Sequence, residues 1–230
     1  MRISVVIPAF NEEATLGACL ESIVNQDVPA HEVIVVDNGS IDGTAKVAGD
    51  FGAKIISETR PGIVHARNAG FNAATGDVIA RIDADTRAPR DWIRRIRDHF
   101  VSNDCDALAG IGRPYDALLL QTTLYMRLFF AFMRMLQGGK EVLLGFNMAI
   151  SRAFWRKVRD ELCTNEEWIH EDIDLSIHIH QAGGRILRDN RLICLTSARR
   201  PMTHPLSFFW EYPRRTWRTI RFHRAHRRSV

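Results

Sequence analysis

The chain has 230 residues, enough for one domain with a sizeable core, and its 46% hydrophobic and 25% charged residues are typical of an ordinary globular protein. Its four cysteines are far apart and form no C-x-x-C pair, which fits neither a zinc site nor a disulfide framework. Reduced buried thiols in a cytosolic protein are the simplest expectation. The opening M-R-I-S-V-V-I-P is too short in its apolar part, and broken by Pro8, to be a signal peptide.

Charge is distributed unevenly along the chain. From Arg199 onward there are nine arginines and one acid, Glu211, a net charge of +8; the remainder carries −4, because the whole chain carries +4. A basic tail on a mildly acidic body predicts contact with an anionic surface, either phosphate or lipid headgroups.

The first half alternates strand and helix patterns. Asn11 is expected to cap a helix whose first turn holds Glu12 and Glu13 and whose apolar residues recur at helical spacing. Further helices are expected from about residue 44, at 64–74 and at 90–101, and strands at 3–7, 33–36, 54–56 and 78–82. This alternation predicts an α/β fold with a mainly parallel central sheet flanked by helices.

The second half is less regular. Residues 118–136 are rich in Leu, Phe and Met, but Arg127 and Arg134 interrupt them, which argues against a membrane-spanning helix. The two arginines are seven residues apart and share one face, so the helix either lies in a membrane surface or packs on the core with two solvated arginines. A strand at 147–150, a helix opening near 170–172 and closed by Gly183-Gly184, and a strand at 185–195 follow.

Two carboxylates end the apolar run V-I-A-R-I-D-A-D-T at 78–86. On an extended chain, residues i and i+2 point the same way, so Asp83 and Asp85 can face one ligand. Like charges held close repel unless a cation lies between them, and a divalent metal carrying a diphosphate would supply one. D-x-D occurs three times in the chain, and a strand-ending turn is the alternative. The first copy is favoured because it closes a strand at the edge where open α/β sheets bind ligands.

Five segments in order resemble the family 2 glycosyltransferases of the GT-A fold: V-V-I-P-A-F-N-E-E (5–13), V-V-D-N-G-S-I-D-G-T (35–44), A-R-N-A-G (66–70), the D-A-D, and H-E-D-I-D-L (170–175). Ordered co-occurrence is more specific than any one motif. The resemblance implies transfer of a sugar from a nucleotide-diphosphate sugar donor, usually with inversion. It implies a single catalytic domain over 1–200, with a nucleotide-binding half (1–110) and an acceptor half (111–200), and a basic aromatic tail at 201–230.

The resemblance also implies a donor site. Pro8 and Phe10 match the family's loop after the first strand, which packs around the nucleotide base. Glu12 matches the acidic residue that follows them in this loop. Asp37 matches the aspartate that accepts a hydrogen bond from the base, although an Asx turn with Asn38-Gly39 also explains it. Arg67 matches an arginine near the ribose and phosphates, for which a solvated helix arginine is the alternative.

The metal and leaving-group positions follow from the same resemblance. Asp83 matches a residue of the ribose and metal shell, and Asp85 matches a direct ligand of Mg²⁺ or Mn²⁺, ions that take further ligands from phosphate and water. Arg199 and Arg200 are expected to offset charge on the leaving diphosphate. His204 follows closely and could add a metal ligand, but a surface histidine is the favoured interpretation.

Asp172 matches the aspartate that removes the acceptor's proton, a role for which a carboxylate is suited. Three acids at a helix start also complement the helix dipole without catalysis. The segment G-F-N-M-A-I-S-R at 145–152 resembles the acceptor region, where glycine permits close backbone approach and Asn147 can donate; a plain inner strand is the alternative. His178 and His180 receive no role, since residues two apart on a helix do not share a face.

The string nearest to the Q-x-x-R-W signature of the family's processive synthases, P-R-R-T-W at 213–217, lacks the Gln, and no segment is expected to span a membrane, which together favour a non-processive enzyme that adds one sugar. Aromatics interleaved with arginine in the tail suit a lipid–water boundary, so we expect a cytoplasmic protein that is peripheral on the anionic cytoplasmic membrane face. Its acceptor is unknown, and a lipid-linked acceptor would be met there. Nucleic acid binding ranks lower. A catalytically silent nucleotide-sugar-binding adaptor and a nucleotidyltransferase are alternatives, the latter disfavoured by the absence of glycine from P-A-F-N-E-E. A Rossmann dehydrogenase is excluded because no G-x-G-x-x-G follows the first strand.

Overall fold

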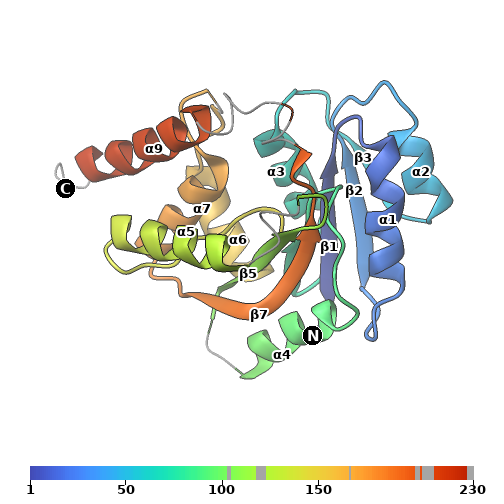
Figure 1. The fold of residues 1–230 in the computed structure, drawn as a ribbon, viewed down its shortest axis with the longest axis horizontal. Coiled ribbons are helices and arrows are strands. Elements are labelled where there is room, and N and C mark those ends of the chain that lie inside the picture. The colour runs from blue at the N-terminus through green and yellow to red at the C-terminus, as the bar shows by residue number, and fades with distance from the viewer. Residues whose placement is uncertain (103–104, 118–122, 166, 200–202, 204–209, 227–230) are drawn as a thin grey trace.

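The part of the chain that the structure describes, all residues except 103–104, 118–122, 166, 200–202, 204–209 and 227–230, contains one seven-stranded sheet with the order β3-β2-β1-β4-β6-β5-β7 (Figure 1). The structure is a computed structural model. The strands are β1 (Ile3–Ala9), β2 (Glu32–Asp37), β3 (Lys54–Ser57), β4 (Val78–Arg81), β5 (Ala107–Pro114), β6 (Met148–Ser151) and β7 (Ile186–Thr196). The helices are α1 (Glu13–Val24), α2 (Thr44–Asp50), α3 (Ile63–Ala73), α4 (Trp92–Ser102), α5 (Thr123–Leu136), α6 (Arg152–Val158), the 3-10 helix η2 (Arg159–Glu161), α7 (Glu171–Gln181) and α9 (Tyr212–His226).

The expected mainly parallel α/β sheet is confirmed, with one reversal among these strands. β1 pairs in parallel with β2 and β4, and β5 with β7, whereas β6 is antiparallel to both of its neighbours, β4 and β5. Six strands therefore end at the same edge, and β6 begins there. In the register of β4 with β6, Met148 at the start of β6 lies opposite Arg81 at the end of β4.

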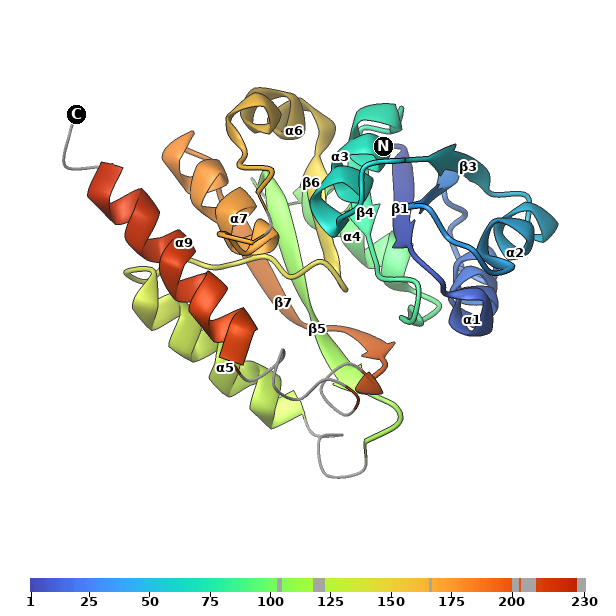
Figure 2. The ribbon, with the colours of Figure 1, turned by 90° about the horizontal axis from the view of Figure 1, so that it is seen from above.

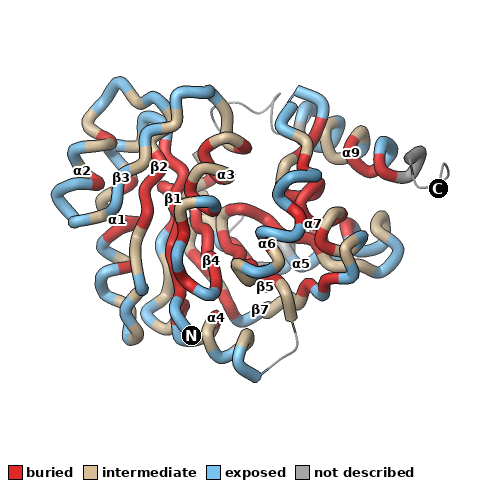
Figure 3. Tube along the Cα trace, turned by 180° about the vertical axis from the view of Figure 1, so that it is seen from behind, coloured by how far each residue is buried: buried red, intermediate tan, exposed pale blue. Residues whose placement is uncertain are grey.

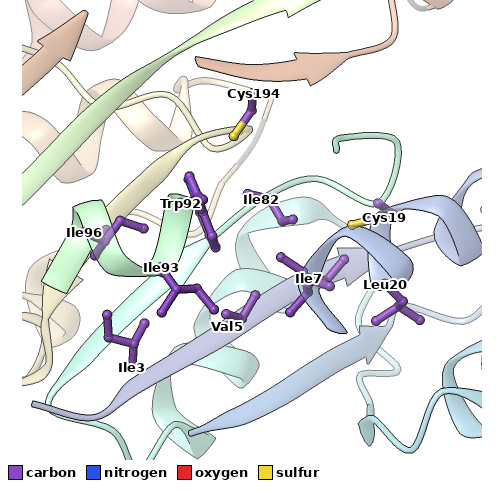
Figure 4. Close-up of a cluster of buried hydrophobic side chains, with 14 of the residues drawn as sticks. Ile3, Val5, Ile7, Cys19, Leu20, Ile82, Trp92, Ile93, Ile96 and Cys194 are labelled. Atoms are coloured by element: carbon purple, nitrogen blue, oxygen red, sulfur yellow. The ribbon is translucent and has the colours of Figure 1, made fainter. Parts of the chain in front are cut away.

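Helices cover both faces of the sheet (Figure 2). Side chains of successive strand residues point to opposite faces, so Val5 and Ile7 pack with α1, α2 and α4, and Val6 packs with α3, α6 and α7. Figure 4 shows the first of these cores, in which Trp92 and Ile93 of α4 approach the side chains of β1. Burial is concentrated along the strands and the inward faces of the helices (Figure 3).

A third apolar cluster lies at the end of the molecule where α5, α7 and α9 meet (Figure 2). Phe130 and Met133 of α5, Ile177 of α7 and Ile220 of α9 belong to it, together with Ile111 of β5. Within the basic tail, α9 is thus a helix packed on α7 rather than a separate extension. The division at residues 110 and 200 stays a prediction.

Most expected elements of the first half are confirmed within two residues, but the helix cap is wrong. Asn11 does not cap α1: its φ of 52° is left-handed, and its Oδ1 accepts a hydrogen bond from the Ile41 N–H at 2.9 Å. The cap position of α1 is Glu12 instead. Neither β5 nor α6 was predicted, because A-L-A-G-I-G lacks polar alternation and α6 is only seven residues long.

The structure forms α5 over Thr123–Leu136 of the 118–136 segment. Residues 118–122 lie outside the described residues. Phe130 is completely buried, which fits a helix packed on the core, and Arg127 and Arg134 are exposed. The opposite side exposes a stripe of large apolar side chains: Leu124, Leu128, Phe132 and Met135. Among the described helices, none combines the length and the apolar character required to cross a membrane.

The close contact of α3 with β1 depends on Gly70. A Cβ at this position would lie 2.3 Å from Val6 Cγ1 and 2.9 Å from Val36 Cγ2, in a buried part of the core. We expect Gly70→Ala to lower the free energy of unfolding by about 1–3 kcal/mol, the usual effect of overpacking, as measured by urea denaturation.

Gly49 in α2 is the matched control, because its Cβ would meet nothing closer than Ile55 Cδ1 at 3.8 Å. Gly49→Ala should raise stability by about 0.5–1 kcal/mol through helix propensity alone. Equal effects of the two substitutions would show that the α3–β1 contact relaxes freely.

Candidate active site

The candidate site lies at the edge where the parallel strands end. β1 and β2 end there at Ala9 and Asp37, and β4 ends at Arg81. The start of β6 arrives at the same edge because that strand is reversed. Open α/β sheets bind ligands at this edge, outside the carboxyl ends of the strands.

The D-A-D segment is not the end of an extended strand, as the sequence analysis assumed. β4 ends at Arg81, and the next residues form a turn in which the Thr86 N–H donates to the Asp83 carbonyl at 3.0 Å. Strand alternation therefore does not orient Asp83 and Asp85 toward one ligand. Arg81 and Asp83 are instead the pair two residues apart whose side chains meet, at 3.2 Å (Nη2 to Oδ1).

The turn is fastened to the end of β7. Arg87 and Leu195 exchange two backbone hydrogen bonds, of 2.7 and 2.9 Å. Next to them, the hydroxyl oxygens of Thr86 and Thr196 are 3.3 Å apart, and the Thr86 hydroxyl also lies 3.4 Å from Asp85 Oδ1. The acidic turn and the chain that leaves β7 thus form one wall of the site.

Arg81 connects this wall to α7. Its guanidinium is 2% exposed, and its Nη1 lies 3.3 Å from Oδ1 of Asp172 while Nη2 contacts Asp83. The other oxygen of Asp172 accepts the Gly145 N–H at 2.7 Å. The pattern of apolar residues around Arg81 offered a signal for this role, since a charge inside a buried strand requires a partner.

The carboxyl groups of α7 have opposite pKa shifts. Burial and then the neighbouring charge of Glu171 raise the pKa of Asp172, against the pull of Arg81. Burial also acts to raise the pKa of Glu171, but His170, Arg81 and Arg67 outweigh it and hold that pKa below its usual value. Asp172 is thus the more basic carboxylate of the pair.

Arg67 does not open to solvent, so the alternative of a solvated helix arginine is wrong; its expected position near the ribose and phosphates of the donor stays a prediction. It is completely buried, and its Nη1 donates to the Glu171 carbonyl at 3.1 Å while Nε and Nη2 contact Asn68 Oδ1. The hydrogen bond to the Glu171 carbonyl ties α3 to the start of α7 and places the guanidinium beneath the site. Burial and the nearby Arg81 lower its pKa.

Glu12 and Arg199 form an ion pair between Arg199 Nη2 and Glu12 Oε1, which joins the loop after β1 to the segment after β7. Asp116, which the sequence analysis missed, holds that segment by accepting the Ala198 N–H at 2.6 Å. Arg199 thus lies at the same edge as the acidic turn. Arg200 and His204 lie outside the described residues.

The predicted base-binding residues are distributed over β1 and β2. Pro8 is buried inside β1, opposite Val36, and not in the following loop, whereas Phe10 is 59% exposed. Asp37 ends β2, and its Oδ1 accepts the Ser40 N–H at 3.0 Å, three residues on, rather than the N–H two residues on that an Asx turn would use. This hydrogen bond occupies one carboxylate oxygen and is compatible with a ligand on the other.

Gly145 is closely approached by Arg81, since a Cβ there would lie 2.3 Å from the guanidinium; the expected approach to an acceptor stays a prediction. Asn147 does not face an acceptor. Its Nδ2 donates to the carbonyls of Ile111 and Leu192, and its Oδ1 accepts the Trp92 indole N–H at 2.9 Å. This side chain therefore links α4, β5 and β7 inside the core.

Asp83 and Asp85 provide the oxygen ligands that Mg²⁺ and Mn²⁺ prefer. Both also raise the pKa of the buried Cys19 thiol, after the larger effect of burial, so their charges act on one small region. In the described residues, neither belongs to a group of three His, Cys, Asp or Glu side chains that could hold a metal alone. A cation here would therefore need ligands from elsewhere, which suits ions that bind through phosphate and water.

Sequence comparison identifies the family. The profile of glycosyl transferase family 2 matches residues 4–162. The chain belongs to this family. A glycosyltransferase of Haloferax volcanii, AglE, is 35% identical over 116 residues, 47% of this chain and 38% of its own length. An uncharacterised glycosyltransferase of Mycobacterium tuberculosis is 46% identical over 117 residues, 50% of this chain and 51% of its own.

Solved structures confirm the GT-A fold of this family member. A mannosyltransferase from Pyrobaculum calidifontis, in complex with GDP-Man and Mn²⁺, superposes with a TM-score of 0.67 at 23% identity, over 85% of this chain and 56% of its own. Glucosyl-3-phosphoglycerate synthase from M. tuberculosis, in complex with Mn²⁺, UDP and glucosyl-3-phosphoglycerate, superposes with a TM-score of 0.67 at 26% identity. The superposition covers 89% of this chain and 74% of that one. The chain spans about half the length, or less, of the two curated relatives named above.

Removal of the Arg81 charge should destabilise this family member strongly. Arg81→Met leaves Asp172 buried without its cationic partner, so we expect unfolding free energy to fall by about 3–5 kcal/mol at neutral pH. An acid whose pKa is raised by folding destabilises the protein above that pKa, so the deficit should shrink as the pH falls and Asp172 takes up a proton. Urea denaturation at several pH values measures both effects.

Arg94→Met is the matched control, because Arg94 pairs with Asp27 at 2.7 Å on the surface, with 45% of its side chain exposed. Its loss should change stability by less than about 1 kcal/mol. If both variants lost the same stability at every pH, the buried ion pair would not organise the site.

Proposed function

We propose that this domain is an inverting, metal-dependent glycosyltransferase that moves one sugar from a nucleotide-diphosphate sugar to an acceptor hydroxyl. The observation that carries the proposal is the convergence of Asp37, Asp83, Asp85 and Asp172 on one sheet edge, from elements that are far apart in sequence. Family membership and the Mn²⁺ and nucleotide complexes of the two solved neighbours support it.

In the proposed donor complex, Asp37 and Phe10 lie beside the nucleotide base, and Arg199 lies beside the diphosphate. Asp85 and Asp83 hold Mn²⁺ or Mg²⁺, which would stabilise the departing diphosphate as a Lewis acid. Arg67 supports the first turn of α7 from below through the Glu171 carbonyl. The pairing of Arg199 with Glu12 means that this guanidinium can turn to phosphate only as the ion pair loosens.

Asp172 is the proposed base. The acceptor oxygen forms a bond to the anomeric carbon as the bond to the diphosphate breaks; the proton of the acceptor passes to an Asp172 oxygen, and the bonding electrons leave with the diphosphate. A raised pKa makes this carboxylate a better proton acceptor near neutral pH. Arg81 and the Gly145 N–H fix both of its oxygens, so the carboxylate needs little reorganisation.

A nucleotidyltransferase and a catalytically silent adaptor are the two alternative functions, and each fits fewer features of the site. A nucleotidyltransferase would need phosphate-gripping backbone amides after β1, where this chain has P-A-F-N-E-E without glycine. A silent adaptor would bind donor without turnover, and it leaves the buried Arg81–Asp172 pair without a chemical purpose. Transferase activity therefore accounts for more of the site.

One experiment on two variants separates metal binding from proton removal. Wild type should gain roughly 5–10 °C in Tm from a matching nucleotide sugar plus Mn²⁺, since ligand at 100-fold its Kd stabilises by about 2.7 kcal/mol. Asp85→Ala should lose the Mn²⁺-dependent part of that gain. Asp172→Asn should keep the whole gain, and lose on the order of 10²–10⁴-fold in transfer rate. UDP- and GDP-sugars form the test panel.

Asp98→Ala, an exposed substitution on α4, is the control and should behave as wild type. Full donor and Mn²⁺ binding with no transfer by wild type, over a broad acceptor panel, would favour the silent adaptor. Normal turnover by Asp172→Asn would show that Asp172 is not the base.

We also propose that the end of the molecule formed by α5 and α9 rests on an anionic membrane surface, where a lipid-linked acceptor would be met. Leu124, Leu128, Phe132 and Met135 are 53–67% exposed along one side of α5. Neighbouring α9 exposes Trp217, with Arg221 over its ring at 5.1 Å. Apolar side chains for the acyl boundary and arginines for the headgroups together suit an interfacial helix pair.

Leu128→Asp combined with Phe132→Asp should abolish flotation of the full chain with phosphatidylglycerol-containing vesicles, because two charges would enter the apolar boundary. Val101→Asp on α4, where the valine is also 67% exposed, is the control and should float as wild type does. Vesicles of neutral phosphatidylcholine should bind less. Wild type that floats with neither lipid would refute the membrane contact.

A further inference from the structure

A second cluster of ligating side chains lies outside the candidate active site, between α7 and α9. These two helices lie side by side (Figure 2). Asp174 and His178 are four residues apart on α7 and so share one face of that helix. His223 of α9 approaches them from the adjacent helix. Asp174 is 1% exposed and His223 7%, so the cluster is enclosed.

The three side chains converge on one point. Oδ1 of Asp174 lies 2.7 Å from Nε2 of His223 and 3.7 Å from Nε2 of His178. One ligand atom of each residue lies within 4.8 Å of those of the other two. Ligands bound tetrahedrally to Zn²⁺ at 2.0–2.1 Å are about 3.3 Å apart, so small side-chain movements would place all three around an ion.

A simple hydrogen bond between His223 and Asp174 explains only two of the three residues. His178 is left with Nε2 beyond hydrogen-bond distance of Asp174 and with a buried Nδ1 that has no hydrogen-bond partner. Nε2 of His178 thus faces a carboxylate oxygen without a hydrogen bond to it, as it would with an ion between them.

The surroundings provide second contacts that orient the ligands. The other oxygen of Asp174 accepts the Cys163 N–H at 3.0 Å, and Nδ1 of His178 faces Glu161 Oε2 at 3.6 Å. A carboxylate on the far nitrogen of a metal-bound histidine is a recurrent arrangement in zinc sites. A hollow of about 200 Å³, lined by His223, Ile177 and Ile220 where α5, α7 and α9 meet, gives room for entry and for a water ligand.

We propose that Asp174, His178 and His223 bind a Zn²⁺ ion that fastens α9 to α7. Two imidazoles and one carboxylate form a ligand set that favours Zn²⁺ over Mn²⁺ or Mg²⁺, which prefer oxygen. This ion is separate from the cation proposed at Asp85. Its role is structural: it holds the basic helix α9 against the helix whose first turn carries Asp172.

The test uses the full chain after EDTA treatment, titrated with Co²⁺ and then with Zn²⁺. Co²⁺ should give the visible absorption of a tetrahedral site at one equivalent, and Zn²⁺ should displace it and raise Tm. His178→Gln and His223→Gln should each weaken Zn²⁺ binding by more than about 100-fold, since even partners outside the ligand shell are worth 10–100-fold. Glutamine at 223 can still donate to Asp174, so the loss would report the ligand.

Two variants serve as controls. Asp85→Ala should keep the Co²⁺ spectrum, which separates this site from the donor cation and makes failure of either proposal visible on its own. His99→Gln should also keep it, because His99 pairs with Asp189 at 3.0 Å outside the clusters of described residues that could hold a metal.

If a glutamine variant does not fold, wild type alone decides: Zn²⁺ should protect the backbone amides of α7 and α9 from hydrogen exchange, as read by mass spectrometry. A wild-type chain with no one-equivalent Co²⁺ spectrum and no Zn²⁺-dependent protection would overturn the proposal. So would a folded His178→Gln variant that binds Zn²⁺ as tightly as wild type.

Discussion

The buried guanidinium of Arg81 is the constraint around which the site is arranged. A charge with 2% exposure inside a sheet is tolerated only beside opposite charges, and the chain provides Asp83 from its own strand end and Asp172 from α7. Gly145 follows from the same constraint, because any larger residue would overlap the guanidinium. One strand, one turn and one helix are thereby held in a single geometry.

Arg81 joins the acidic turn after β4 and the first turn of α7 into one electrostatic unit. Asp83 belongs to the turn proposed to hold the donor cation, and Asp172 is the proposed base, yet both contact the same guanidinium. A cation that draws the Asp83 carboxylate toward itself would leave more of the Arg81 charge to Asp172. Under these two proposals, Arg81 would link donor binding to the basicity of Asp172, since it contacts both carboxylates.

Elements with strong hydrophobic periodicity could be predicted from the sequence. So could the gathering of acids near strand ends, because the alternation of strands and helices brings those ends to one edge. Features that depend on contacts between distant segments could not be predicted. The direction of β6, the burial of Arg67 and the three hydrogen bonds of Asn147 depend on neighbours from distant segments. Arg81 was visible as a charge in an apolar run, but its partner, 91 residues away, was not.

The reversal of β6 explains how the second half of the chain contributes to a site built by the first. A parallel strand at this position would bring its carboxyl end to the ligand edge, and the segment before it would lie at the opposite edge. Because β6 runs the other way, Gly145 arrives beside Arg81 before the strand begins, and its N–H reaches Asp172. The antiparallel strand is thus the means by which the loop before β6 and the first turn of α7 meet the end of β4.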